Sequence, residues 1–419
     1  ALFMPLSNIG LIIIDEEHDN SYKQENNPRY YTHDIAKERA TFHNATLIYG
    51  SATPSLITFS KKHNKTITYH QLTERFNNIT MPKVHILDLN QSLSNHIIHD
   101  TLLENIQTTL QKKQRVLILV NRRGYASFLK CKKCKKTQDC PGCQTSYTYH
   151  SDGYFRCHKC LTVKKMTHQC IYCNKHDVEF YGVAIQKVAT ELQRLFPDKT
   201  ITRIDRDTIK NFTQLQASIK NVEHSDILIG TQMVSKGHNF PNLALVGMIG
   251  VDTILSFPDY RASERLFQLM TQTAGRAGRD INNSQVFIQT LNPDHYVFKF
   301  VKEHNVTGFL NQEHDFRKPF EYPPFRAIVN VIISATNNAD IEKIYPKIKQ
   351  FNETCSKLID VQCIGPKIAP IEKVSGYYRH NVFYKIQHKD YPTFKKNLAK
   401  FPKSAKVRCI IDIDAQSLL

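Results

Sequence analysis

Runs of apolar residues separated by helical patterns recur along the first three quarters of the chain. Strand-like runs lie at residues 10–15, 46–50, 115–120, 179–182, 200–204, 226–230 and 285–290. A helical pattern covers residues 185–196. Strands that alternate with helices predict a parallel α/β sheet with ligands at the carboxyl ends of its strands. The run at 285–290 reads as its closing strand.

The pattern changes after a proline-rich and aromatic segment at residues 316–325, which we interpret as a domain boundary. Beyond it, strands at 328–334, 381–387 and 407–413 surround a helical segment near 338–360, which predicts a small α+β domain. We expect four parts: 1–83, then 84–130 with 174–311, an insertion at 131–173, and 312–419.

Basic residues outnumber acidic ones. Lys and Arg total 56 against 38 Asp and Glu, a formal charge of +18. A chain this basic most often meets a polyanion such as nucleic acid, although a generally basic proteome gives the same charge. No run of 18 apolar residues occurs, so we expect no membrane-spanning helix and no membrane partner.

Cysteines are concentrated in one short segment. Eight of the 11 lie between Cys131 and Cys173 and form four CxxC pairs. A CxxC turn aims two thiolates at one cation, and two such turns complete a tetrahedral zinc site, so four pairs predict two Zn²⁺ ions. The alternative is a disulfide framework, which is typical of secreted proteins. The spacing leaves open whether the pairs combine sequentially, interleaved or nested.

An acidic turn follows the first apolar run, where a phosphoryl-transfer site needs carboxylates. Asp15 would hold Mg²⁺ and Glu16 would polarise the water that attacks a phosphate. An ordinary acidic turn is the alternative. Ser51 and Thr53 follow the next strand, where their hydroxyls can link nucleotide state to a facing lobe.

Two further segments carry groups that bind phosphates. Arg276 and Arg279 are three residues apart, which predicts one helical face, and the glycines beside them permit close approach of another surface. This is how an arginine finger is presented, although a solvated basic helix has the same spacing. The run at 229–238 follows a strand and offers hydroxyls, backbone N–H groups and a lysine.

The order of these motifs resembles superfamily 2 helicases and, more narrowly, the PriA family of bacterial replication-restart helicases. The resemblance rests on DEEH at 15–18, GSAT at 50–53, NRRG at 121–124, the four CxxC pairs, GTQMVSKGHNFP at 230–241 and QTAGRAGR at 272–279. It implies an α/β fold with two RecA-like lobes, the first incomplete and ending near 83. It also implies a two-zinc cysteine module and a C-terminal α+β domain that binds DNA.

The resemblance also implies residue roles. Asp15 and Glu16 match the magnesium and catalytic acids of an ATP site, which Gln272, Arg276 and Arg279 complete from the second lobe. His18, Ser51 and Thr53 match residues that couple the acidic motif at 15–18 to the motif at 50–53 and to the facing lobe. DNA contact is implied for Thr231, Ser235 and Lys236. The resemblance also implies an aromatic-rich loop that couples DNA contact to hydrolysis and contains Tyr22, Lys23, Gln24, Arg29, Tyr30 and Tyr31.

For the metal ions, the resemblance implies the nested grouping. One zinc would be bound by Cys131, Cys134, Cys170 and Cys173. The other would be bound by Cys140, Cys143, Cys157 and Cys160. Mg²⁺ would accompany ATP.

The implied activity is ATP-dependent 3′-to-5′ unwinding of DNA at stalled or branched forks, followed by primosome assembly for replication restart. Implied partners are forked or single-stranded DNA, single-stranded-DNA-binding protein and other primosome proteins. The implied location is the bacterial cytoplasm, in association with the nucleoid.

A phosphate-binding GK[ST] loop is the missing motif. None of the 15 glycines is followed by Lys. We therefore expect that loop upstream, in a longer protein of which this chain is the C-terminal part, and we expect the chain alone not to hydrolyse ATP. The rival hypothesis is a non-catalytic, zinc-stapled DNA-binding scaffold for replication proteins. A translocase on double-stranded DNA is a third.

Overall fold

The computed structural model describes most of the chain. The described residues are 2–24, 26, 29–63, 65–72, 74, 80–92, 96–121, 128–134, 136–138, 140, 147–149, 154–156, 162–165, 169–176, 178–181, 185–204, 225–231, 240–257, 259–277 and 283–416. Contacts divide the chain into two compact units. The first comprises Ala1–Tyr69, Asp259–Arg261 and Leu310–Leu419, and the second His70–Pro258 and Ala262–Phe309. The four-part division expected from the sequence stays a prediction.

A six-stranded parallel sheet forms the centre of the second unit, in the order β12–β13–β6–β14–β15–β5. Its strands are β5 (Lys83–Asp88), β6 (Arg115–Val120), β12 (Ile201–Ile204), β13 (Ile227–Gly230), β14 (Leu243–Ile249) and β15 (Gln285–Thr290). The predicted α/β fold class is confirmed. The expectation that 285–290 is the closing strand of the sheet is wrong, because this strand is not at the edge. β5 pairs with β15 along its whole length and forms the edge instead.

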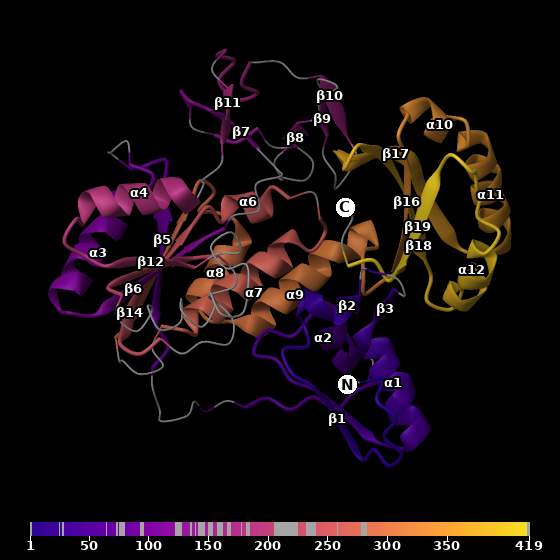
Figure 1. The fold of residues 1–419 in the computed structure, drawn as a ribbon, viewed down its shortest axis with the longest axis horizontal. Helices are drawn as coiled ribbons and strands as arrows, with labels where there is room; N and C mark the ends of the chain where they lie inside the picture. The colour runs from indigo at the N-terminus through magenta and orange to yellow at the C-terminus, as the bar shows by residue number, and fades with distance from the viewer. Residues whose placement is uncertain are drawn as a thin grey trace. The chain divides into compact units, whose positions relative to one another are not determined.

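Helices cover both faces of this sheet (Figure 1). On one face, α3 (Asp100–Gln111) and α4 (Ile185–Leu195) pack on alternate residues of β6, including Val116 and Ile118. On the other, α7 (Ala262–Ala274) packs against β14 and α8 (Tyr296–Lys302) against β5. Successive strand residues alternate between faces, so a strand buried on both sides is a continuous apolar run. The short α6 (Asp252–Leu255) precedes α7, and α9 (Val306–Arg317) follows α8 in the chain.

Short antiparallel strands form the cysteine-rich segment. β7 (Phe128–Cys131) pairs with β11 (Val178–Tyr181). β8 (Thr148–Tyr149), β9 (Tyr154–Arg156) and β10 (Val163–Lys165) form a separate sheet. The expectation that the α/β pattern resumes at 179–182 is wrong for the described part of that run, because Val178–Tyr181 pairs with the strand that enters the insertion and not with the parallel sheet.

The first unit begins with a parallel pair, β1 (Leu11–Ile14) and β4 (Thr46–Tyr49), packed against α1 (Thr32–His43). Ile14 is buried, but Leu11 and Ile13 are 52% and 62% exposed. Within the described residues, α1 packs against the pair while these two side chains of the apolar run face solvent. The remaining elements here are η1 (Asn20–Tyr22), β2 (Lys23–Gln24), β3 (Tyr30–Tyr31) and α2 (Leu56–His63).

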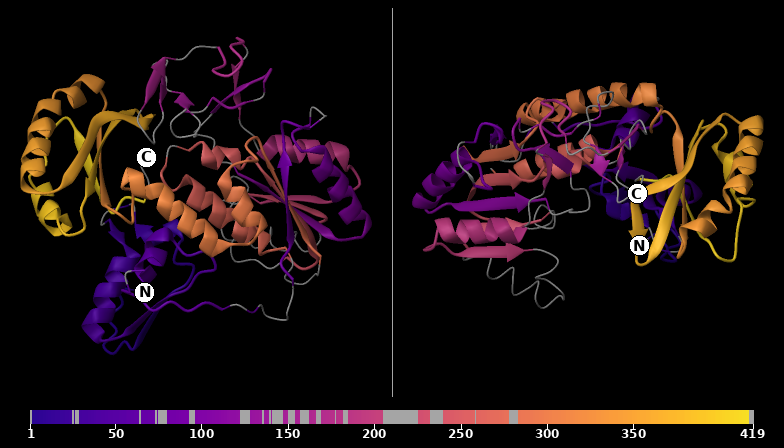
Figure 2. Two further views of the ribbon diagram at one scale, coloured as in Figure 1. Left: turned by 180° about the vertical axis from the view of Figure 1, so that it is seen from behind. Right: turned by 90° about the horizontal axis from the view of Figure 1, so that it is seen from above.

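The C-terminal part of the first unit is an antiparallel sheet in the order β17–β18–β16–β19. Its strands are β16 (Ala327–Ala335), β17 (Val361–Val374), β18 (Tyr377–Ile386) and β19 (Arg408–Ile413). The helices α10 (Asn338–Glu342), α11 (Tyr345–Leu358) and α12 (Tyr391–Leu398) lie on one side of it (Figure 2). The predicted α+β arrangement is present, preceded by η3 (Lys318–Phe320).

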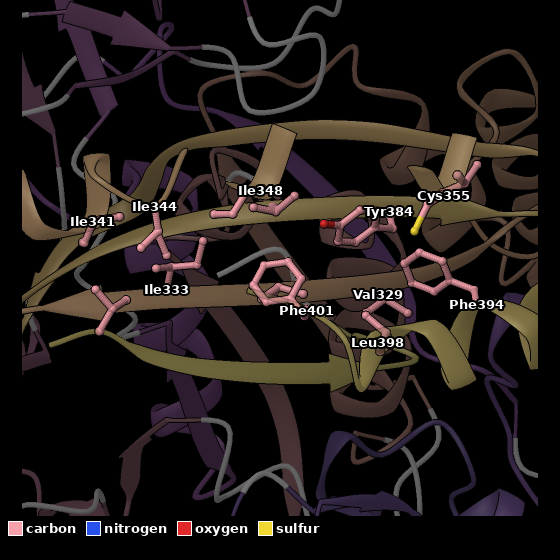
Figure 3. Packing of buried hydrophobic residues seen from close by; sticks show 14 of the residues in the cluster. Val329, Ile333, Ile341, Ile344, Ile348, Cys355, Tyr384, Phe394, Leu398 and Phe401 are labelled. Carbon is pink, nitrogen blue, oxygen red and sulfur yellow. The ribbon is translucent and has the colours of Figure 1, made fainter. Parts of the chain in front are cut away.

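An apolar core lies between this sheet and its helices. Val329, Ile333 and Tyr384 of the sheet meet Ile348 and Phe394 of the helices (Figure 3). Every residue of β16 is buried, and on the other face Tyr260 and Tyr322 pack with Ile328. No helix among the described residues is long and apolar enough to cross a membrane.

Candidate functional site

Asp15 and Glu16 lie in the exposed turn that follows β1. The Glu16 peptide N–H donates to Asp15 Oδ1 at 2.9 Å, and the Tyr22 hydroxyl donates to the Asp15 carbonyl at 2.6 Å. Gly50 lies beside the carboxylate, since a Cβ there would stand 3.5 Å from Asp15 Oδ1. Two exposed carboxylates beside a residue without a side chain fit a hydrated Mg²⁺ ion.

The backbone of this turn is constrained. Glu16 has a φ of 47°, in the left-handed region that residues other than glycine rarely adopt. The Glu17 N–H donates to the Gly50 carbonyl at 3.0 Å, which ties the turn to the end of β4. Such conformations persist where the surroundings determine them, and they cluster at functional sites.

Sequence reasoning missed the third acid of the motif, Glu17, which is 1% exposed. Its Oε1 accepts the Ser55 N–H at 2.6 Å, and its Oε2 accepts the Thr58 hydroxyl at 2.9 Å and lies 3.2 Å from His33 Nε2. Burial raises the pKa of Glu17, but the hydrogen bonds from His33, Ser55 and Thr58 outweigh burial and hold the pKa below its ordinary value. The ionised carboxylate thus joins the turn to the start of α2.

The structure brings the predicted coupling residues together. His18 Nδ1 lies 2.7 Å from Ser51 Oγ, and Ser51 Oγ accepts the Thr53 N–H at 2.9 Å. His18 Nδ1 also lies 3.6 Å from a Glu16 carboxylate oxygen. The acidic turn and the Ser-Ala-Thr turn therefore meet at the carboxyl ends of two paired parallel strands.

The aromatic-rich loop packs mainly against residues of the first unit. Tyr30 and Tyr31 form β3, which pairs with β2, and Arg29 precedes it half-buried. The Lys23 ammonium lies 3.0 Å from Asp412 Oδ1 and also donates to the Ile413 carbonyl. In this structure the Lys23 ammonium is buried in that ion pair, and its contact with DNA stays a prediction.

Predicted site residues in the second unit lie at or near the ends of its elements. Thr231 follows β13, and Gln272 lies in the last turn of α7. Arg276 does not lie on that helix as expected, because α7 ends at Ala274 and a turn begins at Gly275. Ser235, Lys236 and Arg279 lie outside the described residues, as do Arg122 and Arg123.

Sequence reasoning also missed a hydrogen-bonded cluster at the carboxyl ends of β6 and β14. The Asn121 side-chain amide donates to Thr253 Oγ1 at 2.6 Å, and Thr253 Oγ1 donates to the Gly250 carbonyl at 2.7 Å. Asp252 Oδ1 accepts the Thr290 hydroxyl at 2.6 Å. Gly250 has a φ of 73°, which accounts for glycine at this position.

Four of the predicted zinc ligands converge. The Sγ atoms of Cys131, Cys134, Cys170 and Cys173 all lie within 4.8 Å of one another. Cys131 Sγ is 3.6 Å from Cys173 Sγ, and Cys134 Sγ is 3.5 Å from Cys170 Sγ. Four sulfurs around a tetrahedral zinc at about 2.3 Å stand roughly 3.8 Å apart, so the donor set fits Zn²⁺. For these four, the nested grouping is the one present.

Groups around the thiols orient them. Gln138, which is 2% exposed, donates to Cys170 Sγ at 3.4 Å and accepts the Ile171 N–H at 2.9 Å. The Tyr172 N–H donates to the same sulfur at 3.4 Å. Such outer hydrogen bonds hold metal ligands in place. Of the second predicted set, Cys140 is buried, and Cys143, Cys157 and Cys160 lie outside the described residues.

These features define a class: an α/β protein with a parallel sheet, a cluster of four thiols that could hold a metal ion in an antiparallel insertion, and an added α+β domain. Residues 318–416 match the family model for the primosomal protein N C-terminal domain. Over 394 residues the chain is 36% identical to replication restart protein PriA of Bacillus subtilis (strain 168), covering 92% of this chain and 49% of that protein.

Two further relatives give the same result. Identity is 36% over 427 residues to PriA of Haemophilus influenzae, covering 100% of this chain and 58% of that protein. It is 36% over 431 residues to PriA of Rickettsia felis, covering 100% and 65%. The chain belongs to the PriA family of replication restart proteins. It spans between 49% and 65% of the length of these relatives.

A solved structure, S. cerevisiae Dbp5 bound to RNA and ADP BeF3, is similar at 11% identity and a TM-score of 0.39, over 75% of this chain and 64% of that chain.

Proposed function

We propose that the protein is an ATP-dependent DNA helicase that moves 3′ to 5′ at stalled or branched replication forks and starts primosome assembly. The observation that carries the proposal is the meeting of the acidic turn with Ser51 at the ends of β1 and β4. Its support from relatives is 36% identity to replication restart proteins over nearly the whole chain.

In the proposed mechanism, Asp15 and Glu16 act at the ATP phosphates. Mg²⁺, held by Asp15 through water, would neutralise phosphate charge. Glu16 polarises the attacking water, and its exposed carboxylate suits that role. Gln272, Arg276 and Arg279 complete the site from a second lobe. His18, Ser51 and Thr53 link the nucleotide state of the site to that facing lobe.

The proposed DNA contacts lie on both lobes. Tyr22, Arg29 and Tyr30 offer ring faces and a cation beside the acidic turn, and aromatic faces stack on unpaired bases. Thr231, Ser235 and Lys236 would bind the phosphate backbone of the DNA. The metal module, with two zinc ions, and the C-terminal domain would contact forked DNA, single-stranded-DNA-binding protein and other primosome proteins, in the cytoplasm at the nucleoid.

The proposed parts are a first RecA-like lobe ending near 83, a second lobe at 84–130 and 174–311, the module at 131–173, and the DNA-binding domain at 312–419. Because none of the 15 glycines precedes a lysine, we propose that the 419-residue chain does not hydrolyse ATP unaided. Turnover by this chain at a helicase's usual rate would contradict that.

A strand-displacement assay on forked DNA with a 3′ or a 5′ tail tests the proposal on the native gene product. Unwinding should require ATP and the 3′-tailed substrate. Glu16→Gln should keep ATP binding and abolish hydrolysis and unwinding. Glu38→Gln removes the same charge from an exposed position on α1 and should preserve both. Hydrolysis that survives Glu16→Gln would remove Glu16 from its role.

The second candidate is a non-catalytic, zinc-stapled DNA scaffold, which the missing glycine–lysine pair favours. It predicts DNA binding by the native product without any ATP hydrolysis. A third, translocation on double-stranded DNA, predicts hydrolysis without strand displacement.

A further inference from the structure

A stack of rings joins the aromatic-rich loop to the acidic turn. His33 is sandwiched between Tyr31 and Tyr49, with ring centroids 4.3 Å and 5.1 Å away and interplanar angles of 10° on both sides. Tyr22 meets the edge of the same ring at 5.6 Å. Tyr22 and Tyr31 belong to the loop, whereas Tyr49 is the last residue of β4 before the Ser-Ala-Thr turn. One imidazole therefore contacts both segments.

His33 also holds the buried acid of the turn. Its Nε2 lies 3.2 Å from Glu17 Oε2, and the His33 side chain is 4% exposed and that of Glu17 1%. His33 Nδ1 is buried and has no hydrogen-bond partner among the described residues. With Nε2 as the donor, the ring has a single polar contact, which is the Glu17 carboxylate.

The Glu17 end of this contact is rigid. Its other acceptor sites are taken by Ser55 and Thr58, and its N–H by the Gly50 carbonyl. When a buried carboxylate loses one hydrogen-bond donor, it must either regain a hydrogen bond or move. The reason is that a buried charge without hydrogen bonds costs free energy. Glu17 adjoins Glu16, which has a φ of 47°. A shift of Glu17 therefore re-aims the Glu16 carboxylate.

We propose that His33 and Glu17 are positioning residues that couple the aromatic-rich loop to Glu16. A base that stacks on the loop and displaces Tyr31 moves the His33 ring, and the His33–Glu17 hydrogen bond carries that displacement to the acidic turn. The inference rests on the proposed helicase function and adds two residues to it, neither of which touches ATP or DNA.

The test compares ATP hydrolysis by the native gene product with and without single-stranded DNA. His33→Ala removes the ring and the donor, His33→Phe keeps a ring, and His33→Gln keeps a donor. Each should reduce the ratio of DNA-stimulated to DNA-free hydrolysis by about fivefold or more, a typical coupling between sites. DNA affinity should not change. His43→Ala, at the other end of α1, is the matched control and should keep the ratio.

The outcomes separate the inference from the function on which it rests. Wild-type protein whose hydrolysis does not respond to DNA would overturn both. A responsive wild type with equally responsive His33 variants would overturn the inference alone. So would a parallel fall of both rates and of Tm with the ratio intact, because that marks a role in folding only. A lost ratio in His33→Phe at normal Tm supports coupling through the hydrogen bond to Glu17.

Discussion

The cysteine-rich module at 131–173 and the C-terminal domain are both built from antiparallel strands. They differ in how much apolar side-chain surface those strands bury. In the C-terminal domain, all nine residues of β16 are buried and the core includes Tyr384, Phe394 and Phe401. In the module, β8 to β10 have two or three residues each, and all of β10 is exposed. Apolar burial holds the first region together, whereas we expect ligand bonds from the four thiols to a metal ion to hold the second.

Removing the metal should produce the largest difference in stability between the two regions. Structural zinc contributes about 10–16 kcal/mol of apparent binding free energy, which the module's short strands cannot replace. Chelation should therefore abolish hydrogen-exchange protection across β7 to β11 and leave β16 protected. Cys170→Ser should act likewise. Cys355→Ser, which alters a buried cysteine of the C-terminal domain, should keep the zinc content unchanged. Retained protection in the chelated module would refute the comparison.

The converse change removes apolar burial from the C-terminal domain. Phe394 on α12 is 0% exposed, and its ring centroid lies 4.9 Å from that of Tyr384. Phe394→Ala should cost about 3–5 kcal/mol of the domain's unfolding free energy, measured by urea denaturation, without changing the zinc content. Leu358→Ala in the same domain removes a side chain that is 64% exposed and should have little effect.

The two regions also differ in how far the sequence predicts them. The CxxC spacing identifies the metal ligands but not their grouping, which is a three-dimensional property. β17 escapes prediction because Gly365 and Pro366 argue against a strand. The structure accommodates them at an irregularity between Ile364 and Lys367, where Gly365 has a φ of 102°. By contrast, 115–120 is a strand with the predicted bounds, since burial on both faces needs an unbroken apolar run.

At the acidic turn, the sequence specifies three consecutive carboxylates but not which one points inward. Glu17 is selected by Ser55 and Thr58, donors from a segment 38 and 41 residues away. The inward-pointing acid is hard to predict because the deciding contacts are distant in sequence. For the arginines, α7 ends at Ala274, before Arg276, and Arg279 lies outside the described residues.

Lys385 is a charged exception within the apolar C-terminal domain, and it predicts a pH effect. Its ammonium donates to the Phe320 carbonyl at 2.6 Å and lies 3.9 Å from the centroid of the Tyr322 ring. Burial lowers its pKa to about 8, partly opposed by Glu321. Above that pH the folded state loses a proton that the unfolded state keeps up to about pH 10.4, so the unfolding free energy rises with pH in this window.

The measurement is the difference in unfolding free energy between wild type and Lys385→Met at pH 7.5 and 9.5, by urea denaturation. A difference is needed because burial raises the pKa of Cys355 to about 11, which acts in the opposite direction in both proteins. The wild type should gain about 1–2 kcal/mol relative to the variant, since the ammonium keeps some contact with solvent. Parallel pH curves would show that Lys385 titrates normally.

The smallest effect tests whether side chains contribute to the module beyond the metal. Lys136 Nζ lies 4.9 Å from the centroid of the Tyr172 ring, next to Cys170 and Cys173. An exposed cation–π contact contributes about 0.5–1 kcal/mol, so Tyr172→Ala should weaken zinc binding by about two- to fivefold in competition with a chelator. Tyr172→Phe keeps the ring face and should bind zinc like the wild type, as should Lys133→Ala on the neighbouring turn. A loss above tenfold would mean that packing of the protein itself stabilises the module, and the contrast with the C-terminal domain would then be one of degree.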